Sequence, residues 1–243
     1  MNDYISKCNN LLQYGLYNCS TYISKKYPTF APTISLQHHM PLYKKFEEPG
    51  YSIGVWKIEE GLPFFEALFH GHPDIQHDHK RLQWFASRHL ANVMLGQPDA
   101  IVNDETGKPN FKTSAQNISI SHTAGFAAVM LSNKYAVGID VEAIHPKIER
   151  IAHKFMQPEE IAALSPEEKL QKMTLCWSAK ESLFKLYGWG GLEFRTQLLI
   201  EPFQLQQSGT FKANIETPHL PLRGLTVHYQ FFDGHVLSYV AGI

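Results

Sequence analysis

Two carboxylates stand at alternate positions in YAVGIDVEAI, residues 135–144, a segment otherwise typical of a buried β-strand. Because side chains alternate along a strand, Asp140 and Glu142 share one face with Gly138. The apolar side chains on the opposite face are Val137, Ile139 and Val141. Neighbouring carboxylates repel each other, and burying them without a partner is costly. Mg²⁺, a hard cation that binds carboxylates together with substrate phosphates, would remove this cost. The alternative, from this strand alone, is an exposed strand end with two hydrated acids.

The segment WSAKESLFKLYG, residues 177–188, could supply a third carboxylate. On a helix, Trp177, Glu181 and Lys185 recur every four residues and project from one side, with Lys180 at the edge of that face. An acid between lysines is often an exposed ion pair, which is the alternative here. The apolar neighbours indicate a mostly buried helix; they are Leu183, Phe184, Leu186 and Tyr187. Burial favours a functional reason for the polar stripe.

Three basic residues could contact phosphates. Arg81 and Arg88 are seven residues apart in a predicted helix, nearly two turns, so their guanidinium groups should project the same way. Lys108 lies in a predicted Gly-Lys-Pro turn. Arginine suits bidentate phosphate contacts, and lysine acts as a point charge. Taken by itself, each of the three is better explained as a surface charge.

The strand motif ISISHT, residues 118–123, adds polar groups before a turn. Ser119 and Ser121 share one strand face, and His122 stands at the turn. A single histidine at such a place is often a structural hydrogen-bond partner, so both interpretations stay open.

The elements that position these groups follow from periodicity and from turn residues. The sequence predicts a strand at 52–60 and a helix at 74–95 that ends at Gly96. Two short strands around a turn at 123–125 come next, followed by the strand at 135–144. We expect these three strands to form an antiparallel meander.

In the second half, Ser165, Pro166 and Glu168 predict the start of a long helix, and Gly188 predicts its end. The later segments alternate as strands do; they are 194–203, 211–216, 225–232 and 235–243. Each half thus combines helices with an antiparallel sheet, which favours an α+β fold. A polar lead-in of residues 1–40 is expected to hold one short helix near 11–17.

Composition argues against several classes of protein. The 243 residues are 44% hydrophobic, and the net charge of −1 provides no basic field for nucleic acid or an anionic membrane. No apolar run approaches the ~20 residues of a membrane span, and no signal peptide is recognised. Three widely spaced cysteines predict reduced thiols and the cytoplasm. A cluster of histidines matches no zinc pattern and predicts a polar loop; its members are His70, His72, His77 and His79.

In combination these segments resemble the 4′-phosphopantetheinyl transferases of the type that activates surfactin synthetase. The matching segments occur in the family's order, as KRLQWFASR, GKP, ISISHT, VGIDVE, FMQPEE and WSAKESLFKLYGWGGL. The most specific part is the pair GIDVE and WSAKESLFK at this separation. One departure is Met156, where Ser or Thr is usual, whereas Phe155 and Glu159 keep their places.

The resemblance implies an α+β fold of two similar halves related by a pseudo-twofold axis, residues 41–135 and 136–243, with coenzyme A between them. It implies transfer of 4′-phosphopantetheine from coenzyme A to a serine of an apo acyl or peptidyl carrier protein. Adenosine 3′,5′-bisphosphate would leave, and Mg²⁺ would be required. A monomer is expected, because the two halves can supply their own cleft. Residues 1–40 match nothing in the family and are expected to pack on the first half.

The resemblance also implies roles for individual residues. The metal ligands would be Asp140, Glu142 and Glu181, and Glu181 is also the best candidate to accept the proton of the serine. The residues that contact coenzyme A would be Arg81, Arg88, Lys108, Ser121, His122, Asp140 and Lys185. Of these, Lys185 and His122 would hold its phosphates and take part in catalysis with Glu181, and the two arginines would meet its 3′-phosphate or adenine end. Gly138 would leave room for the ligand, and Lys180 would be structural or reach the phosphates.

Two other classes of function remain as alternatives. A Mg²⁺-dependent phosphohydrolase or nuclease would also use clustered carboxylates, but it leaves the Trp-Ser-Ala-Lys-Glu helix and the SISHT turn unexplained. A non-catalytic relative would be expected to lose a metal ligand, and all three are present. The sequence does not identify the carrier protein, which could serve fatty-acid, polyketide or nonribosomal peptide synthesis.

Overall fold

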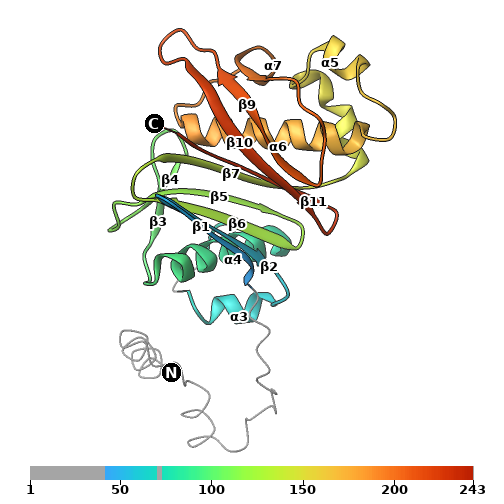
Figure 1. Cartoon of the computed structure of the whole chain (residues 1–243). Coiled ribbons are helices and arrows are strands. Elements are labelled where there is room, and N and C mark those ends of the chain that lie inside the picture. Colours follow the sequence, from blue (N-terminus) through green and yellow to red (C-terminus); the bar gives the residue numbers. More distant parts are fainter. Residues whose placement is uncertain (1–41, 70–72, 243) are drawn as a thin grey trace, which may run out of the picture. The chain divides into compact units, whose positions relative to one another are not determined.

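The computed structural model describes residues 42–69 and 73–242 (Figure 1). Residues Pro41–Ile243 form one compact unit, within which two antiparallel sheets mark two halves. The predicted lead-in and its short helix, as well as His70 and His72, lie outside the described residues. The α+β prediction is confirmed.

The first half is a four-stranded sheet in the order β1-β2-β6-β5, with helix α4 packed on one face. A small hairpin, β3–β4, lies between α4 and β5 in the chain. Aliphatic and aromatic side chains of α4, β2, β5 and β6 form its core. The elements are β1 Leu42–Glu48, β2 Tyr51–Lys57, α3 Leu62–Glu66, α4 Asp78–Leu95, β3 Ile101–Asn103, β4 Pro109–Phe111, β5 Asn117–Thr123 and β6 Phe126–Ser132.

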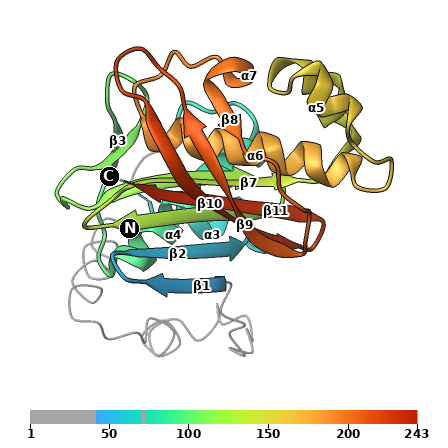
Figure 2. The ribbon, with the colours of Figure 1, turned by 45° about the horizontal axis from the view of Figure 1, so that its top comes forward.

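The second half is a five-stranded sheet in the order β7-β11-β10-β9-β8, with the long helix α6 packed on it. Figure 2 shows β11 running along β7, its antiparallel partner. The elements are β7 Ala136–Ala143, two 3₁₀ turns η2 Pro146–Arg150 and η3 Ala152–Lys154, α5 Pro158–Ala162, α6 Lys169–Tyr187, α7 Phe194–Gln197, β8 Leu198–Ile200, β9 Ser208–Ile215, β10 Leu222–Phe232 and β11 His235–Gly242.

The two sheets pack against each other, and the two helices α4 and α6 cover their outer faces (Figure 1). The predicted apolar face of β7 is buried in this layer, where Val137, Ile139 and Val141 meet β2 and β6 residues such as Ile53 and Met130. This strand is therefore anchored by its apolar face, and its other face looks toward α6. Both halves repeat a strand, a long helix and a hairpin, and in each the strand that precedes the long helix pairs with the last strand, β2 with β6 and β7 with β11.

The predicted three-stranded meander is wrong. The hairpin β5–β6 forms as expected, but both edges of β6 are already used, by β5 and by β2. β7 pairs with β11 instead, at the edge of the second sheet. β7 still lies beside β5, to which it is tied by a side chain rather than a backbone ladder: the Ile139 N–H donates to Ser119 Oγ at 3.0 Å.

Helix ends were predicted better at the C-terminus than at the N-terminus. Gly96 and Gly188 both stop their helices in the left-handed conformation at φ 76°, where a side chain would be strained. α4 begins at Asp78 rather than near residue 74, and α6 at Lys169 rather than Pro166. Ser165 Oγ does accept the Glu168 N–H, at 3.3 Å, but this turn precedes the helix.

Two further segments differ from prediction. The segment 194–203 contains the short helix α7 before β8, rather than one strand. The unpredicted helix α5 is started by a reciprocal pair of hydrogen bonds between Gln157 and Glu160.

Candidate active site

The site begins with an unusually close approach of β7 to α6. Gly138 faces the helix backbone, and a Cβ placed there would overlap the Ser182 carbonyl oxygen and lie 2.9 Å from the Leu186 nitrogen. The prediction that Gly138 leaves room for a ligand is therefore wrong, because the helix itself fills that space. Only glycine allows this packing, and the packing brings the polar stripe of α6 up to the polar face of β7.

Three buried serine hydroxyls sit between α6 and the sheet. The Oγ atoms of Ser178 and Ser238 are 2.9 Å apart, and those of Ser182 and Ser238 are 2.7 Å apart. Ser182 Oγ also lies 3.1 Å from the Ser238 carbonyl oxygen, to which it can donate. Small side chains allow the close approach, and the paired hydroxyls avoid the cost of buried polar groups. This network fixes the register of α6 against β7 and β11.

Asp140 is the buried centre of the polar face, with 3% of its surface exposed. Its Oδ1 accepts hydrogen bonds from Lys185 Nζ at 2.7 Å and from Ser121 Oγ at 2.8 Å. Lys185 also donates to the Ile139 carbonyl at 3.0 Å. Asp140 Oδ2 is buried and has no hydrogen-bond partner among the described residues. A buried carboxylate oxygen with free lone pairs is a site for a further donor or a cation.

Two more carboxylates contribute negative charge around Asp140. Burial, together with the charges of Asp140 and Glu181, raises the pKa of Glu142 to about 7, although Trp177 Nε1 donates to Glu142 Oε1 at 3.1 Å. Burial and the charge of Asp140 also raise the pKa of Glu181. The raised values mean that the local field disfavours further negative charge.

The chemistry of this donor set fits a divalent cation, which would satisfy Asp140 Oδ2 and relieve the repulsion. As arranged, however, no three His, Cys, Asp or Glu side chains within residues 42–69 and 73–242 converge closely enough to hold a metal ion. The predicted ligand set therefore stays a prediction.

Of the predicted polar histidine loop, the structure describes His77 and His79. His77 precedes α4 and His79 lies within it, and the centres of their rings are 5.7 Å apart.

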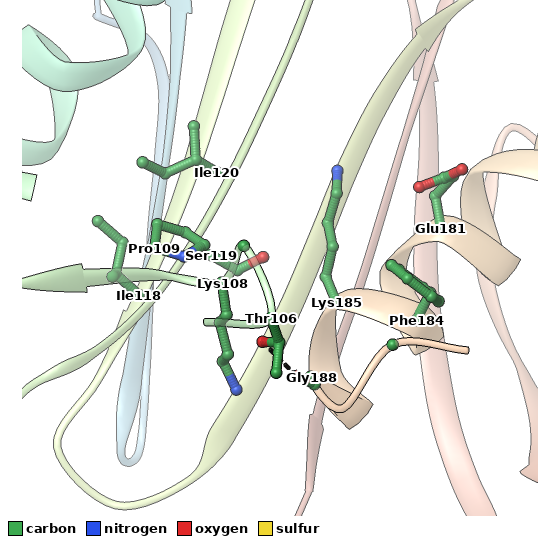
Figure 3. Close-up of a pocket in the computed structure, with 12 residues that line it drawn as sticks. Thr106, Lys108, Pro109, Ile118, Ser119, Ile120, Glu181, Phe184, Lys185 and Gly188 are labelled. Atoms are coloured by element: carbon green, nitrogen blue, oxygen red, sulfur yellow. Dashed lines mark hydrogen bonds between the residues drawn. The ribbon is translucent and has the colours of Figure 1, made fainter. Parts of the chain in front are cut away.

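A cavity of about 270 Å³ lies between the β3–β4 hairpin and strand β5 on one side and α6 on the other (Figure 3). Three predicted site residues line it: Lys108, Glu181 and Lys185. Figure 3 shows the side chains of Glu181 and Lys185 rising from α6 opposite Ile120 and Ser119 of β5. The other residues that line the cavity are Thr106, Gly107, Pro109, Ile118, Phe184, Gly188 and Gly190. An anionic ligand here would meet two lysines and one acid.

His122 lies near the end of β5, and Arg88 lies on α4. Burial, together with the positive charges of Lys185 and Arg88, lowers the pKa of His122. Arg88 stacks on Trp84, with its guanidinium carbon 4.1 Å from the ring centre. Burial lowers the pKa of Arg88 to about 10. The lowered pKa of His122 keeps its imidazole mostly neutral at pH 7.

Arg81 is engaged elsewhere. Its guanidinium forms ion pairs with Asp78 at 3.1 Å and with Glu66 at 3.6 Å. The Nε atoms of both Arg81 and Arg88 are buried without a hydrogen-bond partner among the described residues. The seven-residue spacing predicts that the two arginines project the same way, but their partners differ: Arg81 pairs with two carboxylates, whereas Arg88 stacks on Trp84.

Lys180 has a structural role. Its ammonium is buried and donates to the carbonyl oxygens of Phe155 and Phe194. Burial lowers the pKa of Lys180. It ties α6 to the FMQPEE segment and to the start of α7, which resolves the alternative left open by the sequence.

Sequence reasoning missed the serine network, Thr106 and Phe184. Serines on a buried helix face, four residues apart at Ser178 and Ser182, were a readable signal for close packing. No sequence signal pointed to Thr106, because its hydroxyl contacts the carbonyl oxygen of Gly188, which is 82 positions away in the chain.

No helix in the described part of the chain is both long and apolar enough to cross a membrane. The second half of the chain, residues 136–240, matches the family model described as the 4′-phosphopantetheinyl transferase superfamily. These residues include β7 and α6 and therefore all three clustered carboxylates.

Two curated proteins illustrate the similarity. The chain is 30% identical to the 4′-phosphopantetheinyl transferase AcpT of Salmonella typhimurium over 115 residues, which cover 45% of this chain and 60% of the relative. It is 23% identical to the protein of the same name from Escherichia coli O157:H7 over 154 residues, which cover 61% of this chain and 74% of the relative. The match thus spans less than two thirds of the Salmonella protein. Residues 136–240 of this chain carry the sequence pattern of the 4′-phosphopantetheinyl transferase superfamily.

Proposed function

We propose that this protein transfers 4′-phosphopantetheine from coenzyme A to a serine of an apo acyl or peptidyl carrier protein. The observation that carries the proposal is the cavity wall of α6, where Glu181 and Lys185 stand beside buried Asp140 and across from Lys108. A pyrophosphate needs cations and hydrogen-bond donors on several sides, and this cavity provides them at the meeting of the two halves. The matched superfamily and the two AcpT relatives support the same reaction.

In this reaction the serine oxygen forms a bond to the β-phosphorus of the coenzyme A pyrophosphate. The bond from that phosphorus to the bridging oxygen breaks, and adenosine 3′,5′-bisphosphate leaves with the electron pair. Such phosphoryl transfer depends mainly on positioning and on charge stabilisation. Lys185, held by Asp140 and the Ile139 carbonyl, is fixed to place positive charge beside the phosphates. His122 adds a second donor at the end of β5.

Asp140, Glu142 and Glu181 would hold Mg²⁺. When bound, Mg²⁺ would neutralise pyrophosphate charge and orient its oxygens. Glu181 lines the cavity, and it is the best candidate to accept the serine proton, directly or through a water bound to the cation. Without a cation, burial and the charge of Asp140 raise the pKa of Glu181, whereas a bound cation would lower that pKa and make Glu181 a weaker proton acceptor.

The adenine end of coenzyme A would lie toward the first half. Arg88 is the better candidate to contact the 3′-phosphate, because Arg81 is already ion-paired with Asp78 and Glu66. Lys108 would contact a phosphate from the hairpin wall. Ser121 acts through Asp140, whose Oδ1 it holds.

The finer assignments are proposals as well. Two sheets within one chain support the surfactin-synthetase-activating type, and a complete cleft within one chain supports a monomer. The small number of cysteines supports a cytoplasmic location.

The test is to incubate the protein with coenzyme A, Mg²⁺ and a panel of apo carrier proteins, and to measure carrier mass. We expect one carrier to gain the phosphopantetheine group in the presence of Mg²⁺ and none to gain it after chelation with EDTA. Hydrolysis of simple phosphate esters or nucleic acid, without any change in carrier mass, would reject the transferase and favour the phosphohydrolase.

A further inference from the structure

The tip of the β3–β4 hairpin is a rigid turn built on one carboxylate. Asp104 Oδ1 accepts the backbone N–H groups of Thr106 at 2.9 Å and Lys108 at 3.0 Å, and Oδ2 accepts Asn110 Nδ2 at 3.3 Å. The Thr106 hydroxyl and, to a smaller extent, these hydrogen bonds lower the pKa of Asp104, so the turn is held by a charged acceptor. Gly107 adopts φ 87°, which the turn requires. The positions of Thr106 and Lys108 relative to each other are thereby fixed.

A single side chain connects this turn to the second half of the molecule. Thr106 Oγ1 lies 2.8 Å from the Gly188 carbonyl oxygen, the bond drawn as a dashed line in Figure 3. The last carbonyls of a helix lack partners within the helix, and Gly188 is the C-cap of α6. Thr106 Oγ1 is also 2.7 Å from Asp104 Oδ1. Its one proton is therefore shared between an acceptor within the turn and an acceptor across the cavity.

The same contact places Lys108. A Cβ built on Gly188 would lie 3.0 Å from both Cδ and Nζ of Lys108, so the lysine side chain lies along the end of α6. Thr106, Lys108 and Gly188 all line the cavity that holds Lys185 and Glu181. The Thr106–Gly188 hydrogen bond thus joins the two walls of the cavity at one end, two residues from Lys108 and three from Lys185.

We propose that Thr106 is a positioning residue that fastens the hairpin to the end of α6 and so sets the affinity of the cavity for coenzyme A. This inference rests on the proposed function for the identity of the ligand. The fastening keeps the two walls of the cavity, with Lys108 on one and Lys185 on the other, at a fixed separation, so that coenzyme A binds without the entropy cost of first ordering the hairpin. Thr106 acts on binding, and the transfer step at saturating coenzyme A does not depend on it.

Three variants test the proposal. Thr106→Val removes the hydroxyl and keeps the shape, and Thr106→Ser keeps the hydroxyl. Thr113→Val is the matched control, because Thr113 makes the same kind of bond to a turn-capping carboxylate, Oγ1 to Asp99 Oδ2 at 2.8 Å. Asp99 also accepts the backbone N–H groups of Thr113 and Ser114. The two valine variants therefore share the loss within a turn and differ in the loss of the bond to Gly188.

The first measurement needs no ligand. Hydrogen exchange of the full-length protein should become faster in Thr106→Val both at residues 104–108 and at 186–190, and it should not change at 186–190 in Thr113→Val. Unchanged exchange at 186–190 in Thr106→Val would overturn the fastening whether or not the protein binds coenzyme A.

The second measurement is the coenzyme A dissociation constant by calorimetry, together with KM and kcat for transfer. We expect Thr106→Val to raise Kd and KM roughly three- to fivefold, the effect of about one exposed hydrogen bond, with kcat within about twofold of wild type. Thr106→Ser and Thr113→Val should stay within about twofold on all three. Equal losses in the two valine variants, or a loss confined to kcat, would overturn the positioning role. Failure of the wild-type protein to bind coenzyme A would instead reject the proposed function, with the exchange result left to decide the fastening.

Discussion

The two halves of the molecule use one backbone plan for different purposes. In each half a glycine on the strand before the long helix, β2 or β7, faces two residues of that helix, Gly54 facing Leu90 and Met94, and Gly138 facing Ser182 and Leu186. In each helix the second of these residues lies two positions before the terminal glycine. By this correspondence, Trp56 stands where the second half has Asp140, and His89 stands where it has Glu181.

The contacts support this correspondence. The rings of Trp56 and His89 are 5.1 Å apart, and His89 also packs on Phe64 and Phe65. The first half thus fills the strand–helix junction with an aromatic cluster. The second half places carboxylates and a lysine at the same junction, and its serines and glycine bring the helix closer. The comparison teaches that the backbone plan creates the junction, whereas the side chains decide whether it is filled by aromatic rings or by charged groups.

The largest expected effect is on catalysis at the second junction. Glu181→Gln and Asp140→Ala should each lower the rate of carrier modification by at least about 100-fold, or about 2.7 kcal/mol of transition-state stabilisation. The matched change in the first half, His89→Gln, should leave the rate within about threefold. Transfer assays followed by carrier mass would measure this, with circular dichroism to establish folding. A folded Glu181→Gln variant with near wild-type rate would contradict the assignment.

The next largest effect is on stability, and it should differ between the two glycines that face the long helices. Gly138→Ala forces a methyl group into the backbone of α6, so we expect it to destabilise the protein by more than about 3 kcal/mol. Gly54→Ala meets the flexible ends of Met94 and Leu90, and we expect a loss of about 1 kcal/mol. Urea denaturation measures both. Similar losses would mean that α6 approaches its sheet no more closely than α4 does.

A smaller effect concerns the two arginines of the first half. Arg88→Ala should weaken coenzyme A binding by about tenfold, the value of a charged hydrogen bond, and weaken 3′-dephospho-coenzyme A much less. Arg81→Ala should show a smaller difference, because its charge is already paired. Calorimetry with both ligands gives the answer. If each variant lost the same affinity for coenzyme A and for 3′-dephospho-coenzyme A, neither arginine would contact the 3′-phosphate.

The smallest effect is on stability against pH. Burial lowers the pKa of His89 below its usual 6.5, so below that pH the unfolded chain binds a proton that the folded protein binds less readily. Stability contributed by this site is therefore present above about pH 6.5 and is lost as the pH falls below it. In His89→Phe the urea midpoint should fall less between pH 7.5 and 5.5 than in the wild type. An identical fall in both proteins would show that His89 does not titrate differently on folding.

Short patterns predicted which charged side chains become neighbours, and they did not predict how the strands pair. The spacing of GIDVE and WSAKESLFK identified Asp140, Glu181 and Lys185, and the structure places all three together. Helix ends marked by glycine were also correct. The pairing of β7 was not, because a strand's pattern shows which face is buried and does not show which strand lies at its edge.

The sequence also did not predict that the β3–β4 hairpin would meet the end of α6 at the cavity. Thr106 and Gly188 are 82 positions apart, and neither shows its partner through periodicity or residue type.

The sequence alone determined the α+β class, the two long helices, the apolar anchor of β7 and the residues that bring charge to the junction. These are local properties, set by alternation, helical spacing and turn residues. The tertiary structure decided the edge partner of β7, the engagement of Arg81, the structural role of Lys180 and the packing of Gly138 against a helix rather than a ligand. Those outcomes depend on which groups become neighbours once the chain has closed, and burial and distance then set the charge and hydrogen bonding of each group.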